Sequence, residues 1–228
     1  MCQMEKIFHD KWALILGASS GFGAAACRSF AKTGMNIAGV HLDRKAGMVM
    51  VEELRSELQN FDVKVEFFNI NAADADKRQD VLSKLQAQAQ GKVHVLMHSL
   101  AFGTLRPFIT EDSQESIQKP HLDMTLDVMA NSLVYWSQDL YQKGFFCKGA
   151  RIYAMTSAGS SRVWKSYGAV SAAKSALESH CRQLALELAP QKICETHAFI
   201  LDFQNQVLLV FFQDFHLHRF TLTYHLDF

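Results

Sequence analysis

A glycine-rich turn near the N-terminus constrains this chain more than any other feature. The turn Gly17-Ala18-Ser19-Ser20-Gly21-Phe22-Gly23 follows the apolar run Trp12–Leu16 and precedes a helical stretch. Glycines let such a turn tighten, so that backbone N–H groups approach a pyrophosphate at the positive end of the following helix. The spacing is G-x-x-x-G-x-G rather than G-x-G-x-x-G. A connection that binds no ligand is the alternative. The nucleotide-binding residues that the turn predicts are Gly17, Ser19, Ser20, Gly21, Phe22 and Gly23.

Short apolar runs alternate with amphipathic stretches along the chain. The expected strands are Trp12–Leu16, Asn36–His41, Val63–Asn69, Val93–Met97 and Arg151–Met155. The expected helices are Ala24–Lys32, Met48–Gln59, Asp74–Gln90, His121–Gln142 and Tyr167–Leu188. This alternation is typical of βαβ units, which form a parallel sheet with helices on both faces. Together with the length of 228 residues, it predicts a single α/β domain with a Rossmann-like, doubly wound parallel sheet.

Composition and charge exclude several other classes of protein. The formal net charge is zero, so nothing draws the chain to nucleic acid or to an anionic membrane. No apolar run approaches the roughly 18 residues that a bilayer span needs. The five cysteines are odd in number and form no C-x-x-C pair, so we expect neither a metal site nor disulfides. Such cysteine usage is typical of a reducing compartment, and we therefore expect the protein in the cytoplasm. Residues 1–10 carry charges that do not fit a secretory signal.

The end of the second expected strand bears on the choice of nucleotide. An acidic residue there would bond the adenosine ribose and favour NAD(H), but the expected position is His41. Asp43 follows two residues later, and then the cations Arg44 and Lys45, which could hold a 2′-phosphate. The sequence therefore favours NADPH over NADH, with a solvated cluster of loop charges as the alternative.

A tyrosine, a lysine and a serine follow the fifth expected strand. Tyr167 and Lys174 are seven residues apart, almost two helical turns, so on one helix they project from the same face. The lysine charge would lower the pKa of the phenol and ease proton donation. Ser157 could hydrogen-bond a substrate oxygen. Each residue alone is commonplace; their combination predicts a catalytic site.

These motifs, with Asn131 in the middle of a long helix, resemble the short-chain dehydrogenase/reductase family over roughly residues 10–192. Most members place the tyrosine four residues before the lysine, where this chain has Val170. The longer tyrosine–lysine spacing and the stretch His98–Phe102 look instead like the enoyl-acyl-carrier-protein reductases. Because the glycine-rich turn has the ordinary family form, the chain looks most like the NADPH-dependent enoyl reductases that keep this turn.

The resemblance implies hydride transfer from NADPH to the β-carbon of an enoyl thioester of acyl-carrier protein or CoA. Tyr167 would stabilise or protonate the enolate, Lys174 would hold the nicotinamide ribose, and Ser157 and Asn131 transfer from the wider family. Four further cofactor-binding candidates are Asn71, Ser99, Leu100 and Ala101. The resemblance also implies a homodimer or homotetramer built on the two long helices. The apolar residues nominated for that contact are Leu133, Trp136, Leu140, Leu177 and Leu184.

The resemblance stops after Lys192. The family continues with a sixth strand, a Pro-Gly turn, a segment that covers the substrate and a seventh strand. Residues 193–228 contain neither glycine nor proline, and residues 191–228 hold seven of the 17 phenylalanines. We therefore separate a reductase region, 1–192, from an atypical segment, 193–228, in which the usual last strands and substrate loop are missing or replaced. Val207–Phe212 is a candidate substitute strand or an aggregation-prone segment. An altered reading frame or a truncated end is favoured over a divergent ending.

Two alternatives to enoyl reduction stay open. One is a carbonyl reductase of the same family, acting on 3-oxoacyl thioesters or other ketones. The other is a catalytically inactive remnant that binds a nucleotide or a partner, because an altered C-terminal segment could leave the nucleotide site intact and the substrate pocket incomplete.

Overall fold

The computed structural model describes the backbone of residues 8–191, 196–201, 207–213 and 216–222, and the side chains of residues 8–190. The chain divides into two compact units. The first comprises Met1–Ser99 and Ser137–Arg151, and the second comprises Leu100–Trp136 and Ile152–Phe228. Strand β5 (Phe146–Ser157) and helix α5 (Ser132–Gln142) each pass from one unit into the other.

The first unit contains a parallel sheet whose four complete strands follow the spatial order β3-β2-β1-β4. Their bounds are Trp12–Leu16 for β1, Asn36–His41 for β2, Val65–Asn69 for β3 and Val93–His98 for β4. Every residue of β1 and β2 is buried, as expected for parallel strands covered on both faces. Leu16 pairs with Val40 on one side and His98 on the other. The carboxyl ends of these strands therefore share one edge.

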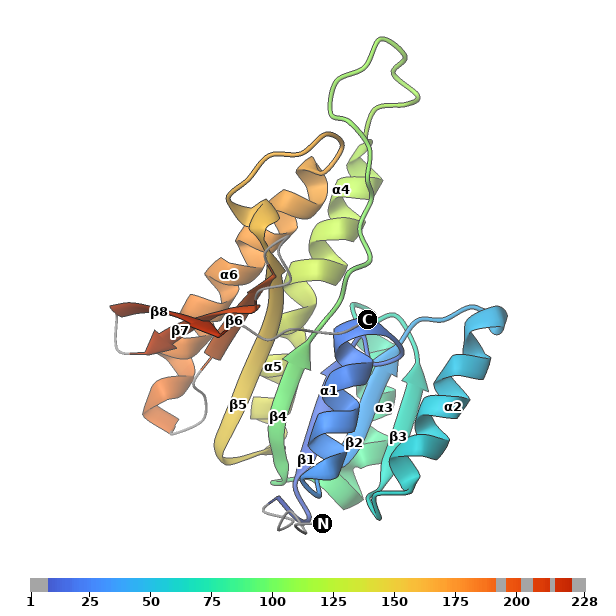
Figure 1. The fold of residues 1–228 in the computed structure, drawn as a ribbon, viewed down its shortest axis with the longest axis vertical. Coiled ribbons are helices and arrows are strands. Elements are labelled where there is room, and N and C mark those ends of the chain that lie inside the picture. Colours follow the sequence, from blue (N-terminus) through green and yellow to red (C-terminus); the bar gives the residue numbers. More distant parts are fainter. Residues whose placement is uncertain (1–7, 192–195, 202–206, 214–215, 223–228) are drawn as a thin grey trace. The chain divides into compact units, whose positions relative to one another are not determined.

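Three helices connect these strands. Figure 1 shows α1 (Gly21–Lys32) and α2 (Met48–Gln59) on one face of the sheet and α3 (Ala75–Ala89) on the other. The expected helices are confirmed, but α1 begins at Gly21, within the glycine-rich turn, and not at Ala24. Asp74 caps α3, and its carboxylate accepts the N–H of Lys77 at 3.0 Å. Arg78 of α3 donates to Asp139 of α5 at 3.0 Å.

In the second unit, the last residues of β5 pair in parallel with β6 (Thr196–Leu201). Strand β7 (Val207–Gln213) is antiparallel to β6, and β8 (His216–Leu222) is antiparallel to β7. Of the last strands, which were expected to be missing or replaced, β6 is present as a parallel strand, and β7 and β8 follow it as an antiparallel ending. The substitute strand at Val207–Phe212 is confirmed, as part of an antiparallel ending.

The two long helices of the sequence analysis are present with altered bounds. The first is α4 (Lys119–Leu126), a π-helical turn (Asp127–Asn131) and α5 in succession. Helix α6 spans Gly168–Leu188, so Tyr167 precedes the helix rather than starting it. The five apolar residues nominated for subunit contacts are buried within this chain, so they form its own core and cannot make that contact.

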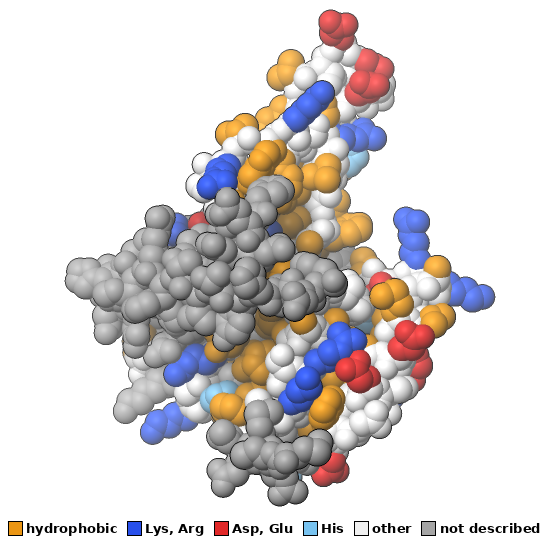
Figure 2. All heavy atoms as spheres, in the orientation of Figure 1, with side chains coloured by type: hydrophobic (Ala, Val, Ile, Leu, Met, Phe, Trp, Pro, Cys, Tyr) orange, Lys and Arg blue, Asp and Glu red, His pale blue; other side chains and the backbone are white. Residues whose placement is uncertain are grey.

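The fold is a parallel sheet with flanking helices in a Rossmann-like arrangement. Acidic and basic side chains are interspersed on the face drawn in Figure 2, which agrees with the formal net charge of zero. Within the described ranges, no helix combines the length and the apolar character of a bilayer span.

Candidate active site

The glycine-rich turn joins β1 to α1 in a conformation that favours glycine at three positions. Gly17 and Gly21 have positive φ angles of 87° and 51°. A Cβ atom on Gly23 would lie 1.8 Å from the carbonyl oxygen of Gly17, so the helix can approach the strand only with glycine there. Ser20 precedes α1, and its side chain makes no capping hydrogen bond. The first N–H groups of α1 are therefore free of that cap and suit a phosphate.

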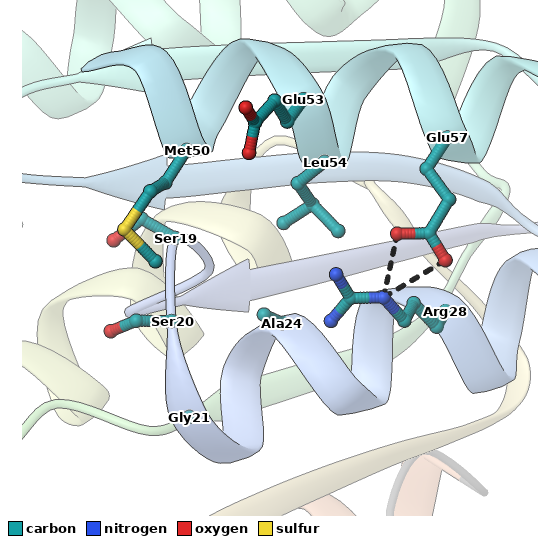
Figure 3. A pocket seen from close by; sticks show the side chains of 9 residues that line it. All are labelled: Ser19, Ser20, Gly21, Ala24, Arg28, Met50, Glu53, Leu54 and Glu57. Carbon is teal, nitrogen blue, oxygen red and sulfur yellow. Dashed lines mark hydrogen bonds and ion pairs between the residues drawn. The ribbon is translucent and has the colours of Figure 1, made fainter. Parts of the chain in front are cut away.

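A hollow of about 280 Å³ lies beside this turn, between α1 and α2 (Figure 3). Its far end is closed by Arg28, whose Nε donates to both carboxylate oxygens of Glu57 at 3.0 and 2.8 Å. The sequence analysis nominated Ser19, Ser20 and Gly21 but missed the rest of the lining, because the two helices meet only in the folded chain. The missed lining residues are Ala24, Arg28, Met50, Glu53, Leu54 and Glu57.

The carboxyl ends of β2, β3 and β4 carry the other nucleotide candidates of the first unit. Arg44 is exposed and begins the short helical turn Lys45–Gly47. Asn71 follows β3, and its side-chain oxygen accepts the N–H of Ala73 at 3.0 Å. Ser99 follows β4, and its N–H donates to Leu16 at 2.8 Å. Each lies at the strand edge where the glycine-rich turn begins.

Tyr167 is fixed by its neighbours in the second unit. Its hydroxyl lies 3.4 Å from that of Ser157, at the end of β5. The ring of Trp164 meets the tyrosine ring edge-on, with centroids 5.4 Å apart. A Cβ atom on Gly159 would lie 2.4 Å from the tyrosine ring. Ser166, directly before it, has a positive φ of 62°, an uncommon backbone conformation that is often found at functional sites. The fold thus holds the phenol in one place.

Lys174 is buried in α6, and its ammonium group is held by backbone carbonyls. Nζ donates to the carbonyl oxygens of Met155 at 2.6 Å and Leu100 at 3.2 Å. Burial lowers the pKa of Lys174 to about 8, with Glu178 and Cys181 acting in the opposite direction. Leu100 thus enters the site through its carbonyl oxygen, whereas Ala101 is exposed.

The position four residues before Lys174 is closed. Val170 is 5% exposed and packs with Met129 and Ala173, against which the ring of Tyr167 also packs. A Cβ atom on Gly103 would lie 2.7 Å from Val170 and from the sulfur of Met129. The backbone at Gly103 therefore covers the site where most members of the resembled family carry their tyrosine.

Asn131 ends the π-helical turn, and its Oδ1 lies 3.1 Å from Nε2 of His180 on α6. Burial lowers the pKa of His180, which favours the neutral imidazole, with Nε2–H as the donor to Asn131. His180 was missed by the sequence analysis because 49 residues separate it from Asn131. The structure therefore brings Tyr167 to Ser157, Lys174 to two carbonyls, and Asn131 to His180.

Comparison with known proteins identifies the fold family. A family model described as "Enoyl-(Acyl carrier protein) reductase" matches residues 17–194. A curated relative, L-xylulose reductase of Mesocricetus auratus, is 26% identical over 183 residues, 79% of this chain and 67% of the relative. The chain belongs to the short-chain dehydrogenase/reductase family.

The chain is also similar to a further curated relative and to solved structures. The very-long-chain 3-oxoacyl-CoA reductase of Anas platyrhynchos is 29% identical over 126 residues, 53% of this chain and 35% of the relative. The chain thus spans about two thirds of one relative and about a third of the other. A short-chain dehydrogenase/reductase from Serratia marcescens has a TM-score of 0.72 at 22% identity, covering 84% of this chain and 73% of that one.

A short-chain dehydrogenase from Burkholderia cenocepacia in complex with NADP has a TM-score of 0.69 at 21% identity, covering 82% of this chain and 71% of that one. At these identities the solved structures show the fold alone. Short-chain dehydrogenases/reductases are NAD(P)-dependent oxidoreductases, and the glycine turn of this chain fits such a nucleotide: at Gly23 a Cβ atom would occupy the space in which α1 meets Gly17.

Proposed function

We propose that this short-chain reductase reduces the 2,3 double bond of an enoyl thioester with NADPH. The proposal rests on the position four residues before Lys174, which is the apolar Val170 and is closed by Gly103. Tyr167, three residues earlier, is the only tyrosine in residues 157–188. Three residues of helix rise about 4.5 Å, so the acid lies further from Lys174 than in the common family arrangement.

That displacement suits an enoyl thioester better than a ketone. In a ketone, the carbon that accepts hydride carries the oxygen that needs the proton. In an enoyl thioester, the oxygen that gains negative charge sits two carbon atoms beyond the carbon that accepts hydride. If Lys174 marks the nicotinamide ribose, a phenol moved away from Lys174 matches the more distant oxygen.

In this proposal, each candidate side chain of the second unit has a separate role. Tyr167 donates a hydrogen bond to the thioester oxygen as the enolate forms, which stabilises the transition state more than the ground state. Lys174 has three N–H groups and uses two on Met155 and Leu100, so the third remains for a ribose hydroxyl. Asn131 and Ser157 support the substrate side.

The nucleotide supplies the hydride, and most of its proposed binding groups lie in the first unit, whereas Leu100 and Ala101 belong to the second. Residues of the glycine turn and the start of α1 bind the pyrophosphate, joined by Asn71, Ser99, Leu100 and Ala101. We propose NADPH rather than NADH because Arg44 and Lys45 are exposed at the end of β2, where they can meet a 2′-phosphate. Asp43, the acid nearest to them in sequence, is turned onto His41, with 2.8 Å between Oδ2 and Nδ1.

Carbonyl reduction is the second candidate, and one observation favours it. The hydroxyls of Ser157 and Tyr167 lie 3.4 Å apart, so both could donate to a single carbonyl oxygen. The substrates would be 3-oxoacyl thioesters or other ketones.

Oxidation of NADPH in the presence of crotonyl and acetoacetyl thioesters, each as the CoA and acyl-carrier-protein derivative, separates these candidates. We expect turnover of the crotonyl thioester to be much faster. Preferential turnover of the acetoacetyl thioester would establish carbonyl reduction. Tight NADPH binding without turnover of either thioester would show that the chain binds the nucleotide but does not catalyse either reaction.

We also propose that the chain forms a homodimer or homotetramer in the cytoplasm. Because the nominated apolar residues are buried in the chain's own core, any such contact has to use other, exposed side chains of the two long helices, such as Leu122, Leu126 and Leu186. Light scattering at micromolar concentration tests the proposal, and a purely monomeric protein would contradict it.

A further inference from the structure

The end of β2 holds a histidine–aspartate pair that does not belong to the catalytic groups. His41 is buried, and its side chain is 2% exposed. Its ring meets Phe67 of β3 edge-on, with centroids 5.9 Å apart. Nδ1 lies 2.8 Å from Oδ2 of Asp43. An ionised carboxylate only accepts hydrogen bonds, so His41 donates through Nδ1–H.

Asp43 is anchored at its backbone as well. Its N–H donates to Oδ1 of Asn69 at 3.1 Å, and its carbonyl accepts from Nδ2 of Asn69 at 2.9 Å. A Cβ atom on Gly47 would lie 2.8 Å from Oδ1 of Asp43, so the carboxylate also packs against this glycine. The carboxylate is thus bounded by His41 on one side and by Gly47 on another.

The two cations that follow are placed differently. Arg44 and Lys45 are exposed, whereas the side chain of Asp43 is 27% exposed. From the sequence alone, the three consecutive charged residues Asp43, Arg44 and Lys45 would all be expected to face solvent at the end of β2. Hydrogen bonding turns the negative one inward and leaves the positive ones outward.

We infer that His41 is a positioning residue for nucleotide choice: it holds the Asp43 carboxylate away from the adenosine ribose. A carboxylate free at this strand end would accept a hydrogen bond from a 2′-hydroxyl and repel a 2′-phosphate. Held by His41, the carboxylate has Oδ2 occupied and is turned from the ribose, so it competes less for a 2′-hydroxyl and stands further from a 2′-phosphate than the exposed Arg44 and Lys45 do. This inference rests on the proposed binding of NADP(H) at the end of β2.

The test compares dissociation constants for NADPH and NADH, measured by calorimetric titration, and uses their ratio. His41→Leu removes the donor while keeping an apolar side chain among buried neighbours. We expect the preference for NADPH to fall at least about tenfold, the lower end of the range for one hydrogen bond to a charged group. His41→Gln restores a side-chain N–H and should keep most of the preference.

Asp43 supplies the decisive controls. In the double variant His41→Leu/Asp43→Asn the released group carries no charge, so the preference should return to the wild-type value or above. Asp80→Asn removes the same charge from α3, where Asp80 has only a long contact of 3.8 Å to Lys77, and should leave the ratio unchanged. Should His41→Leu fail to fold, Asp43→Glu leaves His41 intact and extends the carboxylate beyond the ring, which should lower the ratio.

The outcomes separate the inference from the proposed function. The wild-type ratio alone tests the NADPH preference, whereas the change in ratio tests the role of His41, whichever nucleotide binds more tightly at the start. An unchanged ratio in a folded His41→Leu, or in Asp43→Glu where that variant is needed, overturns the inference. An equal fall in His41→Leu and the double variant does so too, because the effect would then not pass through Asp43.

Discussion

The hydroxyl of Tyr167 lies 3.4 Å from that of Ser157, which comes from the end of a different element, strand β5. Two donors that converge in this way can bind one substrate oxygen from two directions. The pair is formed by the fold, since the backbone of Gly159 and the ring of Trp164 confine the tyrosine ring. Substituting each residue in turn therefore shows how much each hydroxyl contributes to turnover.

Tyr167→Phe should lower kcat on the enoyl thioester by about 10²–10³, the usual effect of removing one donor to a developing oxyanion. Nucleotide affinity should stay nearly constant, because the hydroxyl acts on the substrate. Steady-state kinetics and NADPH titration measure the two effects. Tyr141→Phe, an exposed position on α5, is the matched control. An unchanged kcat in Tyr167→Phe would remove the tyrosine from the mechanism.

Ser157→Ala should discriminate between the two reactions. For an enoyl reductase, its effect on kcat with the crotonyl thioester should be smaller than that of Tyr167→Phe. For a carbonyl reductase the order reverses with the acetoacetyl thioester, because the serine then bonds the ketone oxygen directly. Ser179→Ala, exposed on α6, controls for the loss of a hydroxyl. Which of Tyr167→Phe and Ser157→Ala loses more kcat decides between enoyl and carbonyl reduction.

The sequence predicted the sheet because its strands are short segments rich in apolar residues and its helices have apolar faces of regular spacing. It did not predict the π-helical turn at Asp127–Asn131, since one extra residue per turn leaves little trace in that spacing. Nor did it predict His180 beside Asn131 or Arg28 beside Glu57. Residues 49 and 29 positions apart meet only when the chain has folded.

The candidate catalytic residues show the same limit. Motif spacing located Tyr167 and Lys174, but it could not reveal that Gly103 covers Val170. The sequence left open whether the last strands are missing or replaced, because residues 193–228 lack a Pro-Gly turn, although Thr196–Leu201 contains β-forming residues. The roles assigned to Tyr167, Lys174, Ser157 and Asn131 stay predictions, and the variants above test those of Tyr167 and Ser157.

Gly23→Ala should weaken nucleotide binding severely, because its methyl group would have to enter the space of the Gly17 carbonyl, 1.8 Å away. Gly91→Ala is the control: Gly91 has a positive φ of 69° and nothing within 4 Å of the added atom. That variant should cost about 1–2 kcal/mol of stability from backbone strain and leave NADPH affinity intact. Chemical unfolding measures the loss of stability from backbone strain, and NADPH titration measures the loss of affinity from the collision at Gly23. Normal binding by a folded Gly23→Ala would refute the close approach.

Lys174→Met tests the environment of the buried ammonium group through the pH dependence of stability. The pKa of Lys174 in the folded chain is lowered from 10.5 to about 8 by burial. Between these values the unfolded chain binds more protons than the folded one, so this residue makes stability rise with pH. Below pH 8 both states are protonated, and burial of the charge lowers the stability of the folded state by its full amount.

The unfolding free energy of the wild type should therefore increase relative to that of Lys174→Met as the pH rises from about 7.5 to about 10.5. Comparing the two chains in urea at each pH cancels the titration of all other groups that they share. Lys84→Met, which removes an exposed ammonium group from α3, should show a difference that hardly changes with pH. A constant difference for Lys174→Met as well would mean that the lysine keeps its ordinary pKa. The two carbonyls of Met155 and Leu100 would then fully replace the hydration that burial removes.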